Sequence, residues 1–425
     1  MGGRVLIIIF LFLSGVLEAA GEIDPLFGTE GIVITDFGGS DIAHNIAVQK
    51  DGKSIVVGDS SGDFAIARYE ANGTLDMGFG DEHNGKVITD ISGGMDYGRD
   101  VVIQDDNKII VVGFSHNKSY DFTVMKYKSD GTLDPDFGDS GVAVTDFGSS
   151  ESDDDFAMAT AIQNDGKIVV AGYAFLNFAI VRYDSNGSLD KSFGSNGKVV
   201  TDVNGGDYGS DVAIQDDGKI VLCGDSGDDF ALLRYESNGT LDTEFGEGDS
   251  GIVLTDLGGQ DRARRMVIQE DGKIILVGFS NINSETRTDI AMVRYNPDGS
   301  IDHSFGENGI VRTDIQQLDD MAFAIALQKD GKIVVAGSSL ENRHYAFTVA
   351  RYTPNGKLDT NFGKNGIDIT PVGGIDDDVA YGVSIDAEGK IIVAGSADSE
   401  RDFGVVRYIG KDPNITLSPV YYLLQ

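Results

Sequence analysis

The chain has 425 residues and a formal net charge of −36, because 69 acidic side chains outnumber 33 basic ones. A surface of this charge repels nucleic-acid phosphates and anionic lipid head groups, so we expect no nucleic-acid partner. The one cysteine, Cys223, excludes a disulfide framework and a metal site built from several cysteines.

The first segment, residues 1–21, is predicted to be a secretory signal peptide. Arg4 provides its positive flank, residues 5–16 its short apolar stretch, and the small residues 19–21 its cleavage region. The stretch is too short for a comfortable membrane span, and no later segment is apolar enough to span. We therefore expect a protein that is secreted or periplasmic, starts near Glu22 and is not inserted in a membrane.

The chain from residue 22 to residue 410 consists of seven copies of one phrase, in which variants of Leu-Asp-x-x-Phe-Gly and Asp-Gly-Lys-Ile recur. The phenylalanines of successive copies lie 52 to 60 residues apart, at Phe27, Phe79, Phe137, Phe193, Phe245, Phe305 and Phe362. A repeat of this kind cannot bury its own apolar face. The copies are therefore expected to stack as a solenoid or to close into a propeller.

The copy that begins at Asp207 illustrates the strands expected in every repeat. Residues 207–215 predict a first strand, and Asp217-Gly218 is the signal of a two-residue type I′ hairpin turn. Three more strands are predicted at 219–224, 230–235 and 251–256. Four short antiparallel strands without helical periodicity, repeated radially, predict the blades of a β-propeller.

The number of fourth strands predicts how the ring closes. Sets of three strands begin at Asp41, Asp96, Asp155, Asp207, Asp261, Asp320 and Asp378, and a fourth strand follows the first six sets only. Residues 31–36, at the other end of the chain, form an unattached fourth strand. We therefore predict an all-β, seven-bladed β-propeller of four-stranded antiparallel blades at 22–410, closed by pairing of this N-terminal strand with the last blade. Residues 411–425 form a C-terminal tail with no assigned element.

The repeated phrase closely resembles the delta-60 repeat family of bacterial exported proteins, and the strand order resembles that of WD-repeat propellers. The hallmark residues stand here as Asp-Gly-Lys-Ile-Val-Val-Ala-Gly at 165–172, Val181-Arg182-Tyr183, and Ser-Leu-Asp-Lys-Ser-Phe-Gly at 188–194. The resemblance implies an exported propeller without an assigned activity. One departure is Pro371, which stands where the other units have Asp.

The repeated charged residues have structural explanations. The arginine that precedes the third-strand tyrosine is expected to bind a neighbouring carboxylate, for which the connector aspartate is the candidate. Aspartates also recur at the start of each first strand, four of them in loops that read Gly-Gly-x-Asp or similar: Asp41, Asp96, Asp207 and Asp261. They either cap turns or, as the alternative, bind calcium together with aspartates that end the loop between the second and third strands. Capping is the favoured interpretation.

Catalysis has little support in the sequence. The five histidines are scattered, and neither a nucleophile elbow nor a phosphate loop is present. The alternative to a binding protein is a carboxylate-dependent hydrolase or lyase that acts at the central channel. An inward-facing pair of acids would favour this enzyme, whereas a channel plugged by Val, Ala and Ile would exclude it.

The favoured function is that of a monomeric, non-catalytic scaffold that binds a protein or glycan ligand through the loops of one face. The loop between the second and third strands varies most between repeats, and variable loops on a rigid scaffold are the usual place for recognition. The candidate binding residues in these loops are Lys118, Tyr120, Arg287, Arg343, His344 and Tyr345.

Overall fold

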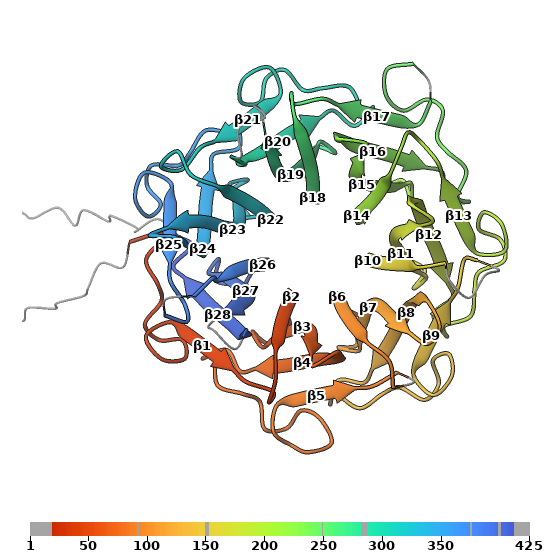
Figure 1. Ribbon diagram of the computed structural model, residues 1–425, viewed down its shortest axis with the longest axis horizontal. Helices are drawn as coiled ribbons and strands as arrows, with labels where there is room; N and C mark the ends of the chain where they lie inside the picture. The colour runs from red at the N-terminus through yellow and green to blue at the C-terminus, as the bar shows by residue number, and fades with distance from the viewer. Residues whose placement is uncertain are drawn as a thin grey trace, which may run out of the picture.

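The computed structural model describes residues 19–91, 93–148, 153–248, 250–281, 287–374, 376–397 and 401–411. Most of the predicted signal peptide and of the predicted tail lies outside these ranges. All regular elements of the described residues are strands. They form four-stranded antiparallel sheets that are arranged as seven blades around one axis (Figure 1). The predicted fold class is confirmed.

The blades are numbered here by their inner strands. The inner strands are β2 (Asp41–Val48), β6 (Asp96–Ile103), β10 (Asp155–Ile162), β14 (Asp207–Ile214), β18 (Gln260–Ile268), β22 (Asp320–Leu327) and β26 (Val379–Ile385). The second strands are β3 (Ser54–Ser60), β7 (Ile109–His116), β11 (Ile168–Ala174), β15 (Ile220–Ser226), β19 (Ile274–Asn281), β23 (Ile333–Glu341) and β27 (Ile391–Ala397).

The third and outer strands complete each sheet. The third strands are β4 (Asp63–Tyr69), β8 (Tyr120–Tyr127), β12 (Asn177–Tyr183), β16 (Asp229–Tyr235), β20 (Asp289–Tyr295), β24 (His344–Tyr352) and β28 (Asp402–Tyr408). The outer strands of blades 1 to 7 are β5 (Lys86–Thr89), β9 (Val142–Thr145), β13 (Lys198–Thr201), β17 (Ile252–Thr255), β21 (Ile310–Thr313), β25 (Ile367–Thr370) and β1 (Ile32–Thr35).

The N-terminal strand closes the ring as predicted. β1 pairs antiparallel with β28 in the register Ile32↔Val406 to Thr35↔Phe403, so it supplies the outer strand of blade 7. Figure 1 shows the red start of the chain lying against the blue last blade. This pairing covers the edge of β28 that would otherwise remain open.

The apolar second and third strands are buried between neighbouring blades, which accounts for their continuous hydrophobic runs. A second repeated contact ties each blade to the preceding one. In blade 1 the hydroxyl of Tyr69 donates to the hydroxyl oxygen of Thr35 at 2.8 Å, and both side chains are buried. Equivalent Tyr–Thr pairs occur at the other six junctions. The tyrosine that ends each third strand and the threonine that ends each outer strand therefore have a structural role.

The hairpin turn predicted at Asp217-Gly218 is wrong in its type. The Gly218 amide donates to the Gln215 carbonyl, and the Gln215 amide donates to the Lys219 carbonyl. Only Gly218 has a positive φ, of 84°, so the loop is a type I turn followed by a left-handed glycine, one residue longer than a type I′ turn.

Each inner strand contains a β-bulge that begins two residues after its repeated aspartate, which sequence reasoning did not predict. In β2 the pairing with β3 passes from Ala43 directly to Asn45, so His44 has no partner. The same irregularity occurs in β6, β10, β14, β18, β22 and β26. A bulge redirects a side chain out of the regular alternation of the strand.

Candidate functional site

The seven bulges build one cavity at the centre of the ring. Each blade contributes its bulged residue to the lining, and the seven residues are His44, Arg99, Met158, Ser210, Arg264, Phe323 and Tyr381. Arg265 is an eighth lining residue, and the cavity has a volume of about 270 Å³. The repeats have similar sequences around this position but carry different side chains at it. The lining of the cavity therefore differs from blade to blade although the framework around it is repeated.

Two of the lining arginines have unused hydrogen-bonding capacity. The Nε atoms of Arg99 and Arg264 are buried, and neither has a hydrogen-bond partner. Burial lowers the pKa of both guanidinium groups, which shows that their charge is incompletely compensated. Within the described residues, neither arginine forms an ion pair with a carboxylate. Both are suited to donate to an anionic group in the cavity.

The other two arginines near the cavity are paired. Arg262 lies 3.1 Å from Asp225 and 3.3 Å from Asp228. Arg265 lies 3.4 Å from Asp211 and 3.9 Å from a carboxylate oxygen of Asp100. These guanidinium groups therefore stabilise the walls of the site and are not free to bind a ligand.

His44 is held neutral within the lining. Burial, with a smaller contribution from the positive charge of Arg99, lowers the pKa of His44 to about 4. Its Nε2 atom lies 2.9 Å from an oxygen of Asp59, to which it can donate, and its Nδ1 atom lies 3.0 Å from Nη1 of Arg99, from which it can accept. At neutral pH the imidazole therefore bridges the carboxylate and the guanidinium without adding a charge.

An aromatic band lines the blade 2 to blade 4 side of the ring, beside Arg99. It is a chain of ring contacts with centroids 4.9 to 6.1 Å apart. Its members are Tyr97, Phe114, Tyr120, Phe156, Tyr173 and Tyr208. All except Phe114 are partly exposed, and the Arg99 guanidinium lies 5.1 Å from the centroid of that buried ring. The site therefore combines flat aromatic surfaces with positive charge.

The carboxylates closest to the channel are engaged in holding blades together. Asp100 accepts the Thr160 amide at 2.7 Å, and Asp211 accepts the Met266 amide at 2.8 Å, each bond reaching the inner strand of the next blade. Both acids also lie beside Arg265 in a second cavity, of about 250 Å³. The described lining of the main cavity contains no carboxylate, and it is not plugged by Val, Ala and Ile. Asp100 and Asp211 are thus a pair of acids that line one cavity, but each is held by a backbone amide of the next blade and lies beside Arg265.

The predicted loop residues lie on one face but do not form one site. Tyr120 joins the aromatic band through Phe114 and Phe156. The remaining five are spread over blades 2, 5 and 6. Lys118, Arg287, Arg343 and His344 are exposed, and Tyr345 is half-buried. Sequence reasoning missed the bulged residues, although one signal was available: they occupy a variable position inside an otherwise repeated strand.

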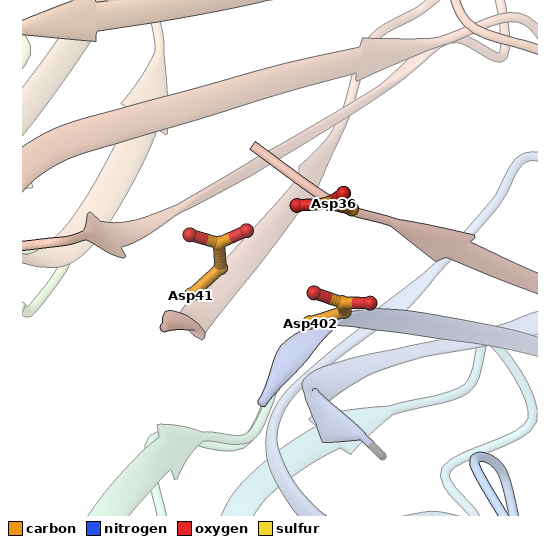
Figure 2. A group of neighbouring side chains, drawn as sticks. All are labelled: Asp36, Asp41 and Asp402. Atoms are coloured by element: carbon orange, nitrogen blue, oxygen red, sulfur yellow. The ribbon is translucent and has the colours of Figure 1, made fainter. Parts of the chain in front are cut away.

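The aspartates that begin the inner strands cap the loops before them, so the capping interpretation is confirmed. Asp41 Oδ2 accepts the Phe37 amide at 2.6 Å, and Asp207 Oδ2 accepts the Val203 amide at 2.8 Å. Equivalent bonds occur in the other five blades. Of the four aspartates predicted as calcium ligands, Asp41, Asp96 and Asp261 also belong to groups of three neighbouring carboxylates, whereas Asp207 belongs to none found among the described residues. Figure 2 shows the group that contains Asp41.

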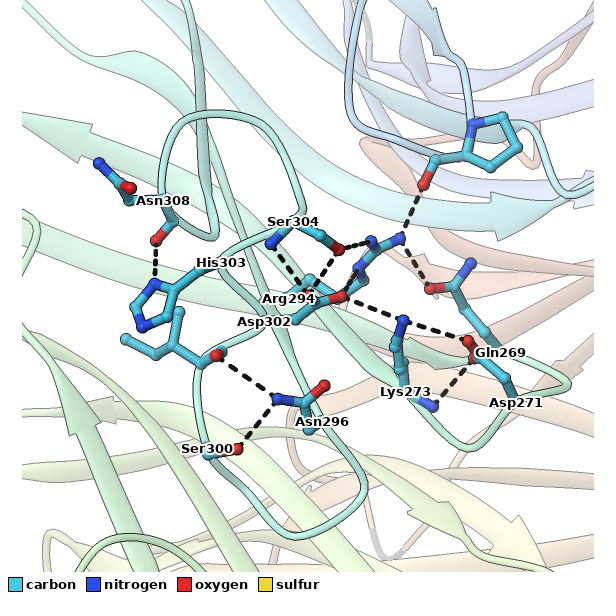
Figure 3. Close-up of polar contacts among 12 residues, drawn as sticks. Gln269, Asp271, Lys273, Arg294, Asn296, Ser300, Asp302, His303, Ser304 and Asn308 are labelled. Atoms are coloured by element: carbon cyan, nitrogen blue, oxygen red, sulfur yellow. Dashed lines mark hydrogen bonds and ion pairs between the residues drawn. The ribbon is translucent and has the colours of Figure 1, made fainter.

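The repeated arginines bind the connector aspartates, which confirms the predicted pairing. Figure 3 shows this network in blade 5, where Arg294 Nε donates to Asp302 at 2.8 Å. Arg294 also donates to the carbonyl of Pro354 in the next blade at 2.7 Å, and its guanidinium lies 4.5 Å from the ring centroid of Phe305. These arginines are thus structural groups that join blades.

Comparisons with known proteins agree with this architecture. A family profile described as a domain of unknown function (DUF5122) beta-propeller matches one segment in each blade: 49–79, 104–137, 163–193, 215–245, 269–305, 328–362 and 387–408. A search of curated proteins finds no match. No helix that is long and apolar enough to cross a membrane occurs in the described parts of the chain.

Solved structures align with this chain at low sequence identity. The WD40 repeats of RRP9 align with a TM-score of 0.50 and 8% identity, over 92% of this chain and 99% of that one. Sqt1 from Chaetomium thermophilum aligns with a TM-score of 0.49 and 12% identity, over 88% and 96% of the two chains. A protein of unknown function from Dyadobacter fermentans DSM 18053 aligns with a TM-score of 0.47 and 10% identity, over 91% and 100%.

Proposed function

The chain belongs to the DUF5122 beta-propeller family, and from the cavity that its bulges build we propose that it is a non-catalytic scaffold that binds the acidic end of a glycan. The observation that carries the proposal is the pair Arg99 and Arg264, whose buried Nε atoms have no partner. A buried polar group without a partner costs free energy, which an anionic ligand group would recover.

The charge of the whole molecule restricts the ligand further. A net charge of −36 disfavours a long polyanion, because most of its charges would face an acidic surface. A ligand with one acidic group avoids this repulsion when that group enters the cavity between the two arginines. A cavity of about 270 Å³ has room for a single small unit of this kind.

The aromatic band favours a sugar as the body of this ligand. Partly exposed rings of Tyr97, Tyr120, Phe156, Tyr173 and Tyr208 offer flat apolar faces beside the arginines. A sugar ring has an apolar face of matching shape, and its hydroxyl groups can bond to the tyrosine hydroxyls. The chain has no tryptophan, so tyrosine and phenylalanine would supply the aromatic surface for the sugar.

The proposal also places the protein outside the cytoplasm. The support for export is the composition of residues 1–21, with a positive flank, a short apolar stretch and small residues after it. A glycan-binding scaffold at this location would meet polysaccharides of the cell surface or the surroundings.

Calorimetric titration of the purified chain tests the proposal. The probes are oligosaccharides with one terminal uronic acid, the same oligosaccharides with a neutral terminal sugar, and a short acidic peptide. We expect the acidic oligosaccharides alone to bind, and their affinity to fall as salt is raised. Binding of the peptide without binding of the acidic oligosaccharides would show that the ligand is of another class.

A further inference from the structure

Five of the seven blade junctions carry three carboxylates whose oxygens all lie within 4.8 Å of one another. We call these groups the junction triads. They are Asp36/Asp41/Asp402, Asp63/Asp90/Asp96, Asp121/Asp146/Asp155, Asp229/Asp256/Asp261 and Asp289/Asp314/Asp320. Each triad has the same origin. One aspartate lies at the start of a third strand, one follows the outer strand of that blade, and one lies at the start of the inner strand of the next blade.

The local structure of each triad leaves carboxylate oxygens unused. At the junction of blades 1 and 2, Asp96 Oδ2 accepts the Ile91 amide at 2.6 Å, and Asp90 Oδ1 accepts the Gly93 amide at 2.7 Å. These bonds shape the connecting loop and hold the side chains in place. Each of these two carboxylates keeps a second oxygen for another partner.

The unused oxygens include buried ones, which distinguishes the triads from an ordinary acidic surface. The Oδ1 atoms of two inner-strand aspartates, Asp96 and Asp155, have no hydrogen-bond partner although these residues are 0% exposed. At Asp41 and Asp320 the hydroxyl of a second-strand serine, Ser60 or Ser339, lies beside the carboxylate. Figure 2 shows the Asp41 carboxylate turned toward the space that it shares with Asp36 and Asp402. A buried, ionised carboxylate oxygen without a donor requires a cation or a proton nearby.

The pKa values of these acids follow from the same geometry. Burial, together with the negative charges of the neighbouring aspartates, raises the pKa of Asp96, Asp155 and Asp320 to about 7. Burial and the adjacent carboxylate of Asp146 likewise raise the pKa of Asp121. Three such groups in contact repel one another, so a bound cation would stabilise all of them in the ionised form.

We propose that each junction triad binds one calcium ion. Calcium takes six to eight oxygen ligands at about 2.3–2.6 Å, so two of its ligands can lie no more than about 5 Å apart. The spacing within the triads meets this limit. Three carboxylates, binding through one or both oxygens, supply three to six of these ligands, and water can complete the shell. Magnesium, with ligands at about 2.1 Å and an octahedral shell, requires closer oxygens and fits less well.

The two remaining junctions serve as internal comparisons. At the junction of blades 3 and 4, Asn177 begins the third strand, while Asp202 and Asp207 keep the other two positions. At the junction of blades 6 and 7, Ala346 and Pro371 occupy two of the positions, and Asp378 alone remains. The first of these junctions therefore needs one carboxylate to become complete.

Calcium at the triads would fasten each inner strand to the blade before it. The three ligands come from segments that are joined by loops, so the ion would close these loops around itself and hold neighbouring blades in register. Five calcium ions would also offset ten of the 36 net negative charges. This inference does not depend on the identity of the ligand in the central cavity.

Calcium counting on the full chain tests the inference. The protein is stripped with chelator, dialysed against micromolar calcium in the presence of millimolar magnesium, and its bound calcium is measured by mass spectrometry of the elements. We expect one calcium ion for each of the five triads and a melting temperature that rises with calcium. A chain that retains no calcium, or whose melting temperature is unchanged by the chelator, would overturn the proposal.

Two variants, one that removes a triad carboxylate and one that adds a carboxylate, change the expected calcium count without relying on unfolding of the protein. Asp121→Asn reproduces the natural junction of blades 3 and 4, so the variant should fold and bind one calcium ion fewer. Asn177→Asp completes the triad with Asp202 and Asp207, so this variant should bind one more. The same count in both variants and in the original chain would show that the bound calcium lies elsewhere.

Discussion

Arg407 and Asp24 are 383 residues apart in the sequence, yet Arg407 Nε donates to Asp24 Oδ2 at 2.8 Å. The same bond joins Arg182 to Asp190, eight residues away, inside blade 3. The N-terminus thus supplies the connector as well as the outer strand of the last blade. Lys390 also lies 2.7 Å from the Asp24 carboxylate, so two positive charges depend on this one side chain.

Loss of the Asp24 carboxylate should weaken the ring at its closure. Asp24→Asn leaves the buried Arg407 without its partner, and we expect a loss of about 3–5 kcal/mol in the free energy of unfolding. β1 belongs to blade 7, but the chain connects it directly only to blade 1, so noncovalent contacts alone hold it in place. We therefore expect the amides of β1 to exchange before those of the other strands. Hydrogen exchange measured by mass spectrometry checks this order.

Asp190→Asn is the matched control for the closure. It removes the same pair inside blade 3, where the outer strand β13 continues directly from the third strand through the connector. We expect a similar loss of stability without selective exchange of 198–201. Equal exposure of the outer strand in both variants would contradict the assigned closure.

Gly58 should not tolerate a side chain, because a Cβ at this position would overlap the carbonyl oxygen of Ile42 in the inner strand. Gly58→Ala should lower the free energy of unfolding by about 2–3 kcal/mol through overpacking. Gly78→Ala in the same blade is the control, since its Cβ would meet only a flexible Asp76 oxygen at 3.2 Å. Thermal denaturation compares the two, and equal melting temperatures would refute the role of Gly58.

His44 should remain neutral in acid. Its folded pKa is lowered to about 4 by burial and by Arg99, which together outweigh the attraction of Asp59, with Arg265 and the Tyr381 ring also close by. The unfolded chain binds this proton near pH 6.5, so the stability that neutral His44 contributes is complete above that pH and is lost as the pH falls toward 4. NMR titration of the imidazole measures the value directly. A midpoint near 6.5 would contradict the buried geometry.

Processing of an exported chain should leave Ala20 in place. Ala20 is 1% exposed, its carbonyl accepts the Gly363 amide at 2.9 Å, and the Gly21 amide donates to Ile409 at 2.7 Å. Cleavage close to Glu22 would remove these bonds between the last two blades. Intact mass of the protein from the periplasm or medium should place its first residue at or before Ala20. A mature chain that starts at Glu22 and melts at the same temperature would refute this prediction.

The ring could be predicted from the sequence because its determinants are local and repeated. The Asn-Gly and Asp-Gly turns, the apolar second strands and the surplus fourth strand at 31–36 require no knowledge of distant contacts. The pairing of Arg182 with Asp190 could also be inferred, since a charge that recurs in a buried strand needs a recurring partner.

The central cavity was missed because a bulge adds one residue to a strand without a turn residue to mark it, and the variation of that position between repeats was the one signal for it. Arg99 and Arg264 therefore resemble ordinary alternating positions of their inner strands. The junction triads were not predicted for two other reasons. Asp63 and Asp96 lie in different blades, so only the three-dimensional structure shows that they are neighbours. The capping role of the inner-strand aspartates was also enough to explain why they recur.

The measurement that tests the proposed function most directly is the affinity of an acidic oligosaccharide for two variants that each lose one arginine. Arg264→Gln removes a positive charge from the cavity, and Arg343→Gln removes one from an exposed loop of the same face. We expect Arg264→Gln to weaken binding about tenfold or more, as loss of a charged hydrogen bond does, and Arg343→Gln to leave binding unchanged. Unaltered binding by Arg264→Gln together with loss of binding by Arg343→Gln would contradict the cavity as the site and assign recognition to the loops.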